Sequence, residues 1–145
     1  MESNKSTEVA KLFHDVSKKM KLGMRKSFEE MGITMPQGML ICALFKRGEL
    51  KISEISKQLG LTDSTVSGVV DRLEKQKIVE RIRSEADKRI VYVKLTDRFA
   101  QVHKDFHTTA DKNIKKMLDR ASDDELDKII EGLKVFNRIL RKEIE

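Results

Sequence analysis

Short polar side chains that suit nucleic-acid binding gather between positions 62 and 72. The set comprises Thr62, Asp63, Ser64, Thr65, Ser67, Gly68 and Arg72. Hydroxyl groups are small and both donate and accept hydrogen bonds, so a helix carrying them can bring its backbone close to base edges and phosphates. The free amide groups at the start of such a helix, behind Thr62, can also hold a phosphate. These residues therefore have the chemistry needed to read a DNA major groove.

Cationic side chains lie in a second stretch, at Arg83, Lys88 and Arg89. An arginine on a protruding loop suits the narrow, electronegative form of the minor groove. Asp87, two residues before Arg89, can hold its guanidinium through a bidentate pair. Such charges taken alone are typical of a solvated loop. Their position after the hydroxyl-rich stretch favours a second contact to DNA.

The pattern around these residues predicts a helix-turn-helix followed by a β-hairpin. Ser53 is placed to cap a short helix and to contact DNA, and a glycine turn leads to Thr62, which caps the next helix. Residues 78–83 and 90–95 alternate in polarity, which predicts two strands joined by the charged loop 84–89. Capped helices after a glycine turn also occur in proteins that never touch DNA. The order helix, turn, helix and hairpin is therefore the informative feature.

Further helices are predicted on both sides of this region. Apolar residues recur at three- and four-residue steps over 9–31, which indicates an amphipathic helix. Thr34 and Gln37 can form a capping box for a helix that ends at Gly48, and residues 50–52 follow as a short extended piece. Downstream, Thr96 is expected to cap a long helix over 97–117. A second capping box at Ser122–Glu125 begins the last helix.

The fold class expected is mainly α with a small β-hairpin wing: a winged helix-turn-helix domain at 34–96, an N-terminal dimerisation helix at 1–33 and C-terminal dimerisation helices at 97–145. The apolar stripes of the terminal helices have few partners inside a small winged domain. Burial against a second copy, giving a symmetric homodimer, is the simplest explanation; packing within one subunit is the alternative. Two winged domains roughly 34 Å apart would read a palindromic operator.

The composition of the chain favours some classes of function and argues against others. The 145 residues carry a formal net charge of +6, which favours an anionic partner such as double-stranded DNA. The absence of a long apolar run or a signal-like N-terminus predicts a cytoplasmic protein with no membrane partner. Cys42 is the only cysteine, so no internal disulfide is expected. No nucleophile–base set, phosphate-binding glycine loop or zinc pattern is present, so neither an enzyme nor a cofactor is expected.

Apolar, adaptable side chains mark a candidate effector pocket in the first two predicted helices. It comprises Met20, Met24, Met39 and Cys42. Methionine fits irregular apolar surfaces, so a small aromatic or lipophilic effector could lodge there; ordinary core and dimer packing is the favoured alternative. Cys42 is expected to be buried and inert. His103 and His107 have a spacing that suits a metal ion, but without a third ligand an exposed helix face is favoured.

Residues 33–96 resemble the MarR family of bacterial regulators. The resemblance rests on ISEISKQLGLTDSTVSGVVDRLEKQKIVER and on Asp87-Lys88-Arg89 leading into Val93-Lys94-Leu95-Thr96. It implies intertwined terminal helices in a homodimer, Arg89 in a minor groove with Asp87 steadying the wing, and a repressor released by an effector bound between the dimer and DNA-binding domains. Two residues depart from the family pattern, Gly68 where many members carry a larger polar residue and Phe99 where glycine is common.

Two other functions remain open at this point. A basic architectural protein would bind DNA with little sequence preference and a steep salt dependence. An interaction module would use the long helices to bind a protein partner and would not retain DNA. The operator, the regulated genes, the identity of an effector and the sign of regulation are not encoded in any recognisable motif.

Overall fold

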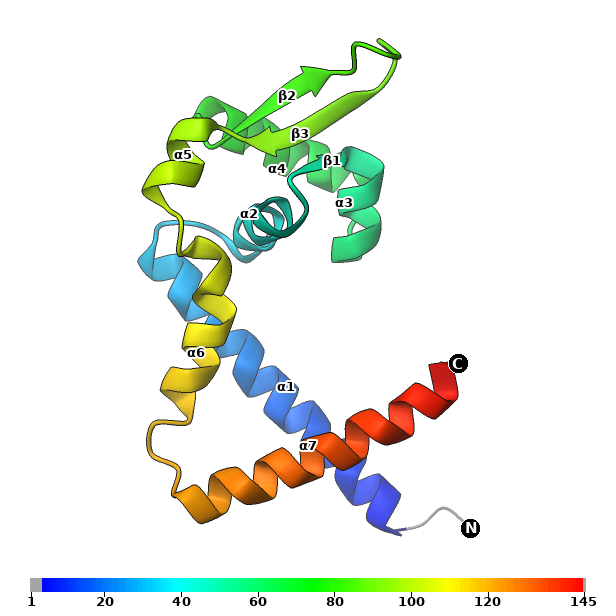
Figure 1. The fold of residues 1–145 in the computed structure, drawn as a ribbon, viewed down its shortest axis with the longest axis vertical. Coiled ribbons are helices and arrows are strands. Elements are labelled where there is room, and N and C mark those ends of the chain that lie inside the picture. The colour runs from blue at the N-terminus through cyan, green and yellow to red at the C-terminus, as the bar shows by residue number, and fades with distance from the viewer. Residues whose placement is uncertain (1–3, 145) are drawn as a thin grey trace. The chain divides into compact units, whose positions relative to one another are not determined.

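Most of the chain is helical, as predicted, and a small antiparallel sheet lies at one end of its first unit (Figure 1). The computed structural model describes residues 4–144, without the side chain of His107. The chain divides into two units, one ending at Asn113 and one beginning at Ile114. In chain order the elements are α1 (Asn4–Glu30), α2 (Met35–Arg47), β1 (Glu49–Lys51), α3 (Ile52–Leu59), α4 (Asp63–Lys75), β2 (Val79–Arg83), β3 (Val91–Leu95), α5 (Asp97–Val102), the 3₁₀ helix η1 (Phe106–Thr108), α6 (Thr109–Met117) and α7 (Asp123–Ile144).

The helix starts follow the predicted caps with one exception. The Gln37 amide donates to Thr34 Oγ1 at 3.3 Å, and the Thr34 amide donates to Gln37 Oε1 at 3.0 Å, which forms the expected capping box of α2. The prediction that Ser53 caps α3 was wrong, because α3 begins at Ile52, two residues before the start that a Ser53 cap would give. Its N-cap is Lys51, whose amide donates to Glu54 Oε1 at 3.1 Å. Ser53 therefore lies exposed in the first turn.

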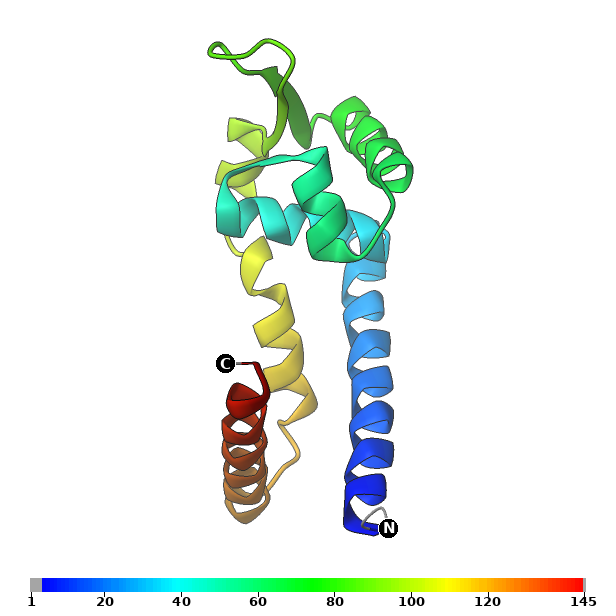
Figure 2. The same ribbon diagram turned by 90° about the vertical axis from the view of Figure 1, so that its right-hand side faces the viewer.

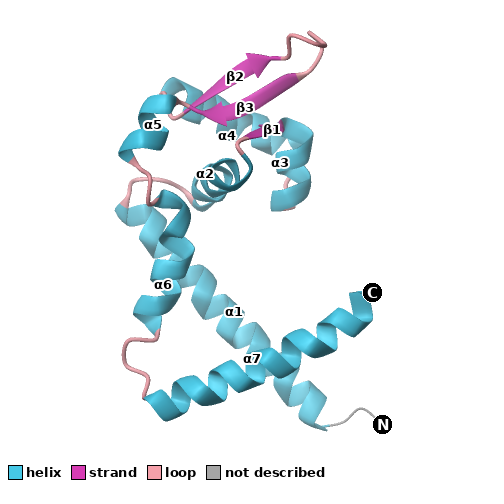
Figure 3. Cartoon of the chain, viewed as in Figure 1, coloured by secondary structure: helices cyan, strands magenta, loops and turns pink. Residues whose placement is uncertain are grey.

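The sheet has the strand order β1-β3-β2, with antiparallel pairing throughout (Figure 3). The hairpin of β2 and β3 was predicted within one residue of its observed bounds. The extended piece expected at 50–52 is a third strand at Glu49–Lys51, in which Leu50 pairs with Val93. Both side chains are buried, so the short strand ties the hairpin to the core.

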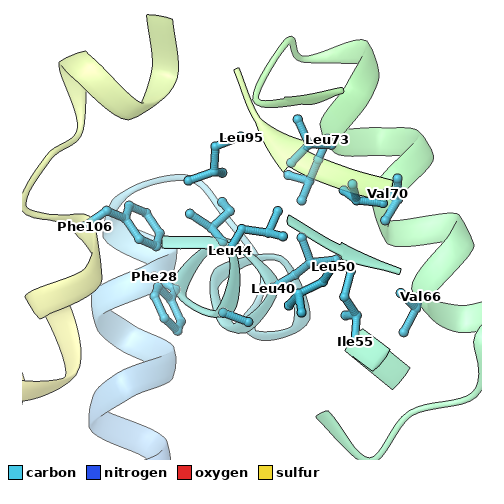
Figure 4. Packing of buried hydrophobic residues seen from close by; sticks show 14 residues of the cluster. Phe28, Leu40, Leu44, Leu50, Ile55, Val66, Val70, Leu73, Leu95 and Phe106 are labelled. Carbon is cyan, nitrogen blue, oxygen red and sulfur yellow. The ribbon is translucent and has the colours of Figure 1, made fainter. Parts of the chain in front are cut away.

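One hydrophobic core joins the sheet to α2, α3, α4 and the end of α1 (Figure 4). Its fully buried large side chains are Phe28, Leu40, Ile41, Leu44, Leu50, Ile55, Leu73, Val66, Val70, Val79 and Val93. Gly38 lies against the Phe28 ring so closely that a β-carbon there would come within 2.6 Å of ring carbons. The glycine thus lets α2 approach the end of α1.

The long helix expected over 97–117 is interrupted. Thr96 Oγ1 accepts the Phe99 amide at 3.3 Å and caps α5 as predicted, but α5 ends at Val102. After this break the buried Phe106 ring stacks on Phe28 at 5.9 Å and on Phe45 at 6.2 Å between centroids. Burial of this ring offsets the lost helical hydrogen bonds, because an aromatic side chain removes a large apolar area from water.

The second unit contains the long amphipathic helix α7. Its start is the predicted capping box, in which the Glu125 amide donates to Ser122 Oγ and the Ser122 amide donates to Glu125 Oε2. Several large apolar side chains of α7 are exposed, namely Ile129, Ile130, Leu133, Val135, Ile139, Leu140 and Ile144. Among residues 4–144, no helix is long and apolar enough to cross a membrane.

Candidate nucleic-acid interface

Helices α3 and α4 form the helix-turn-helix that the sequence predicts. Gly60 ends α3 in a left-handed conformation with φ of 67°, which favours glycine because it has no β-carbon. Thr62 then caps α4. The side chains of Val66, Val70 and Leu73 enter the core. The opposite face of α4 is consequently left to solvent.

The exposed start of α4 carries a cluster of three hydroxyl groups. Thr62 Oγ1 lies 2.8 Å from Thr65 Oγ1 and 3.2 Å from Ser64 Oγ, and it accepts the Thr65 amide at 3.2 Å. Hydroxyl protons rotate, so each group can switch between donor and acceptor when a base edge or phosphate replaces its neighbour. Gly68 lies one turn further along, with no atom within 4 Å of a β-carbon built there. A partner surface can therefore approach the backbone of α4 closely.

Of the other residues predicted to face outward on this helix, two are exposed as expected and one is less exposed than expected. Asp63 and Arg72 are exposed, and Ser67 is half-buried. Ser53, in the first turn of α3, is exposed as well but belongs to a separate helix start. The hydroxyl cluster, Gly68 and Arg72 thus follow one another along α4.

The loop between β2 and β3 extends away from the helices and is held by its own hydrogen bonds (Figure 2). The Asp87 amide donates to Ser84 Oγ at 3.2 Å, and the Ser84 amide donates to the Ile90 carbonyl at 2.8 Å. Arg83 Nη1 donates to the Lys88 carbonyl at 3.0 Å. Arg83 was expected to project from the wing towards DNA, like the other two cations. Its guanidinium instead donates to the loop backbone and so braces the loop that carries Lys88 and Arg89.

The predicted pair between Asp87 and Arg89 is present. Arg89 Nε donates to Asp87 Oδ1 and Nη2 donates to Oδ2, both at 3.1 Å, and the Arg89 amide donates to Oδ1 at the same distance. The Arg89 side chain is still 90% exposed. These hydrogen bonds lower the pKa of the Asp87 carboxyl, chiefly through the Arg89 side chain and then through its amide. The guanidinium is held in one orientation while it stays accessible to a ligand.

A further contact between wing and helix was not anticipated from the sequence. Arg81, on β2, pairs with Asp71 and Glu74 of α4. Asp71 is exposed, but its carboxylate accepts a hydrogen bond from the Arg81 guanidinium. The charges in the segment 71–81 hint at such pairing, but the partners depend on how the strand packs against the helix.

The candidate effector residues are only partly brought together. Met24 and Cys42 are half-buried against the core, and Met39 is half-buried on α2. Met20 lies 38% exposed on α1. Burial raises the pKa of the Cys42 thiol, an effect partly offset by the Lys46 charge. A raised pKa lowers the thiolate fraction at neutral pH, in keeping with the inert role expected of Cys42.

The break after α5 means that His103 and His107 do not lie on one continuous helix. His103 is the C-cap that follows α5, with its ring 4.5 Å from the Phe99 ring, whereas His107 belongs to η1. The two residues were expected on one face of a continuous helix, so that prediction was wrong. Within the described part of the chain, no group of three or more His, Cys, Asp or Glu residues is placed to hold a metal ion.

Known proteins share both the sequence pattern and the fold. The model of the MarR family matches residues 33–91. The HTH-type transcriptional regulator YfiV of Bacillus subtilis is 30% identical over 138 residues, covering 95% of this chain and 86% of its own length. The HTH-type transcriptional repressor MdtR of Bacillus subtilis is 35% identical over 74 residues, covering 51% of this chain and 48% of its own.

Solved structures extend the similarity to nearly the whole chain. A MarR family protein from Bacillus stearothermophilus superposes with a TM-score of 0.74 at 27% identity, covering 98% of this chain and 94% of that one. Wild-type MarR from E. coli reaches a TM-score of 0.75 at 24% identity, covering 88% and 94%. The latter similarity concerns the fold alone. The terminal helices as well as the winged region thus have counterparts in known structures.

Proposed function

This chain belongs to the MarR family and is a DNA-binding transcriptional regulator, not an enzyme; we propose that it is a repressor that occupies a palindromic operator as a homodimer. One observation carries this proposal. A helix with an exposed hydroxyl face and a loop with an exposed, oriented arginine are attached to the same core. Such a pair suits simultaneous contacts in a major and an adjacent minor groove.

Each element has a proposed role on the duplex. The start of α4 enters the major groove, where Ser64, Thr65 and Ser67 meet base edges and Gly68 permits close approach. The residues proposed to contact phosphates or steady the helix there are Ser53, Thr62, Asp63 and Arg72. On the wing, Arg89 enters the minor groove, Asp87 orients it, and Arg83 and Lys88 support the loop and the phosphate contact.

We assign the winged domain to residues 34–96 and dimerisation to 1–33 and 97–145. The exposed apolar residues of α7 support this assignment, as do those of α1: Val9, Leu12, Phe13 and Val16. Large exposed apolar faces mark interaction surfaces, and two copies can cover them symmetrically. A homodimer also places two reading helices on one palindrome. A repressor of this kind acts on chromosomal DNA, so its proposed location is the cytoplasm.

Release from the operator is proposed to follow binding of a small aromatic or lipophilic effector near Met20, Met24, Met39 and Cys42. These residues lie on α1 and α2, which lead from the proposed dimer helix into the winged domain. An effector can weaken DNA binding only by its greater affinity for a dimer whose reading helices no longer match successive grooves. Adaptable methionine side chains suit such a ligand.

Selection from a random double-stranded DNA pool tests the proposed function. We expect enrichment of a two-fold symmetric site of about 15–20 base pairs, which two winged domains one helical turn apart would read. Tight but unselective binding with a steep salt dependence would instead identify a basic architectural protein. Loss of all DNA at physiological salt would contradict both and favour a protein-interaction module.

A further inference from the structure

We propose that Arg81 is a positioning residue that sets the angle between the reading helix α4 and the wing. The inference rests on the proposed function, in which both elements contact one duplex. Arg81 lies on β2, the strand that leads into the wing loop, and its guanidinium reaches across to α4. The same residue therefore joins the two parts that must match two adjacent grooves.

The contact has three points of attachment. Arg81 Nη2 lies 2.7 Å from Asp71 Oδ1, and Nη1 lies 2.9 Å from Glu74 Oε1. The Arg81 amide donates to the other Glu74 oxygen, Oε2, at 3.3 Å. Asp71 and Glu74 are three residues apart, so they are neighbours on one helix face. The planar guanidinium can hold both at once, which a lysine ammonium does less rigidly.

The Arg81 contact lies where it can restrain the orientation of α4 relative to β2. Helix α4 and strand β2 are joined by only three residues, Gln76, Lys77 and Ile78, which hold the two elements together at one point. Arg81 lies two residues beyond the first residue of β2, which is roughly 7 Å along an extended strand. A second attachment at this distance, in addition to the core packing of α4, restrains α4 from pivoting about the turn. Buried residues such as Val70 and Leu73 already seat α4 on the core, and the Arg81 contact adds a polar brace that fixes the remaining freedom in the angle between helix and wing.

Arg81 also neutralises carboxylates on the exposed surface of α4. Its side chain is 26% exposed, whereas those of Asp71 and Glu74 are 59% and 44% exposed. Asp71 directly precedes Arg72, which we place at the DNA. Without Arg81, two free negative charges would lie near the phosphates, and their repulsion would be strongest at low salt. The brace and the charge effect can be separated experimentally.

A neighbouring ion pair supplies the matched control. Glu80 also lies on β2, and its Oε1 is 3.4 Å from Lys94 Nζ on β3. Those two residues are already paired in the sheet ladder. Loss of this ion pair removes a charge contact from the same strand, but it leaves the attachment to α4 in place. Glu80→Gln is therefore expected to leave DNA affinity within about twofold.

The test combines orientation in the free protein with affinity for DNA. Residual dipolar couplings of backbone amides report whether α4, β2 and β3 behave as one rigid body, and anisotropy titration with the selected operator reports affinity. In Arg81→Gln we expect the couplings of α4 to show a changed or motionally averaged orientation relative to β2 and β3. We also expect the affinity for DNA to fall at least tenfold. Arg81→Lys should recover part of both. Asp71→Asn combined with Glu74→Gln should reproduce the loosened helix without adding free negative charge. If Arg81→Gln fails to fold, this double variant tests the brace in its place.

Two results would overturn the inference. One is unchanged affinity in Arg81→Gln together with a single rigid body. The other is weaker binding while the couplings stay as in the unaltered chain, since that would leave only the charge effect. If the unaltered chain selects no operator, the proposed function fails, but the couplings still decide whether Arg81 braces the helix.

Discussion

The Arg89 guanidinium and the Asp87 carboxylate form a bidentate ion pair in the wing loop, and both nitrogen–oxygen distances are 3.1 Å. The aspartate belongs to a loop that is itself hydrogen-bonded through Ser84. The arginine is thus oriented before any ligand arrives, although its side chain is almost fully exposed. An oriented group loses less conformational freedom on binding than a mobile one.

Removal of the wing arginine should weaken DNA binding without affecting assembly. We expect Arg89→Ala to lose at least tenfold affinity for the selected operator, because the minor-groove contact and its charge disappear together. Arg120→Ala, which removes the same charge from the turn before α7, serves as the control. Affinity is measured at one fixed salt concentration and oligomeric state by sedimentation. Equal affinities for Arg89→Ala and the unaltered chain would exclude the proposed wing contact.

The ion pair between Asp87 and Arg89 should persist at neutral and mildly acidic pH. The pKa of Asp87 is lowered from the ordinary 3.8, so the pair is intact above that value and is lost only as the pH falls through the lower, folded-state pKa. An NMR titration of the Asp87 carboxyl carbon should therefore show a midpoint below 3.8. Arg89→Ala should move this midpoint upward. A midpoint at or above the ordinary value in the unaltered chain would contradict the pairing.

The hydroxyl cluster at the start of α4 should contribute selectivity more than overall affinity. Thr65→Ala removes a hydroxyl that lies 2.8 Å from Thr62 Oγ1. If Thr65 contacts a base directly, the loss is on the order of 1–3 kcal/mol at one base pair and little elsewhere. Binding to a panel of single-base-pair operator variants measures this, with Thr65→Ser as the control that keeps the hydroxyl. A uniform loss across the panel would instead indicate a phosphate contact.

A methyl group at position 38 should destabilise the fold. In Gly38→Ala the new β-carbon would meet the Phe28 ring, which is buried and stacked on Phe106. Overpacking of this kind costs about 1–3 kcal/mol, which exceeds the gain of about 0.5–1 kcal/mol from replacing a helical glycine. Gly68→Ala, where space is open, should show only the gain. Urea denaturation compares the two, and a Gly38→Ala protein as stable as Gly68→Ala would refute the close contact.

The proposed dimer surface can be disrupted at a single exposed leucine. Leu133 on α7 is 61% exposed in one copy of the chain. Leu133→Asp would bury a carboxylate in an apolar interface, so we expect dissociation to monomers and loss of palindrome binding. Lys134→Ala, the neighbouring residue, changes the net charge equally and should remain dimeric. Sedimentation velocity distinguishes the outcomes; a stable Leu133→Asp dimer would place the interface elsewhere.

Helix boundaries could be predicted from sequence because their causes are local. Thr34 with Gln37, Thr62, Thr96 and Ser122 with Glu125 act within one helical turn, and the structure places all of them as caps. The same holds for Asp87 and Arg89, which are two residues apart. For such residues the side-chain type and its spacing already determine the contact.

The misjudged features depend on contacts between distant parts of the chain. The helix after Thr96 breaks because Phe106 packs on Phe28 and Phe45, whose positions follow from the packing of α1 and α2. The contact from Arg81 to Asp71 requires the angle between α4 and β2. The pairing of β1 with β3 likewise joins residues about forty positions apart, for which alternation along the sequence carries no signal.

The contact between Gly38 and Phe28 also constrains how this sequence can change by descent. Any larger residue at position 38 needs a smaller ring or no ring at position 28, so neither position can change freely while the other stays fixed. Across descendants of this chain, the two positions should therefore vary together. A lineage that gains alanine at 38 is expected to have exchanged the phenylalanine at 28 first, because the reverse order passes through an overpacked and less stable protein.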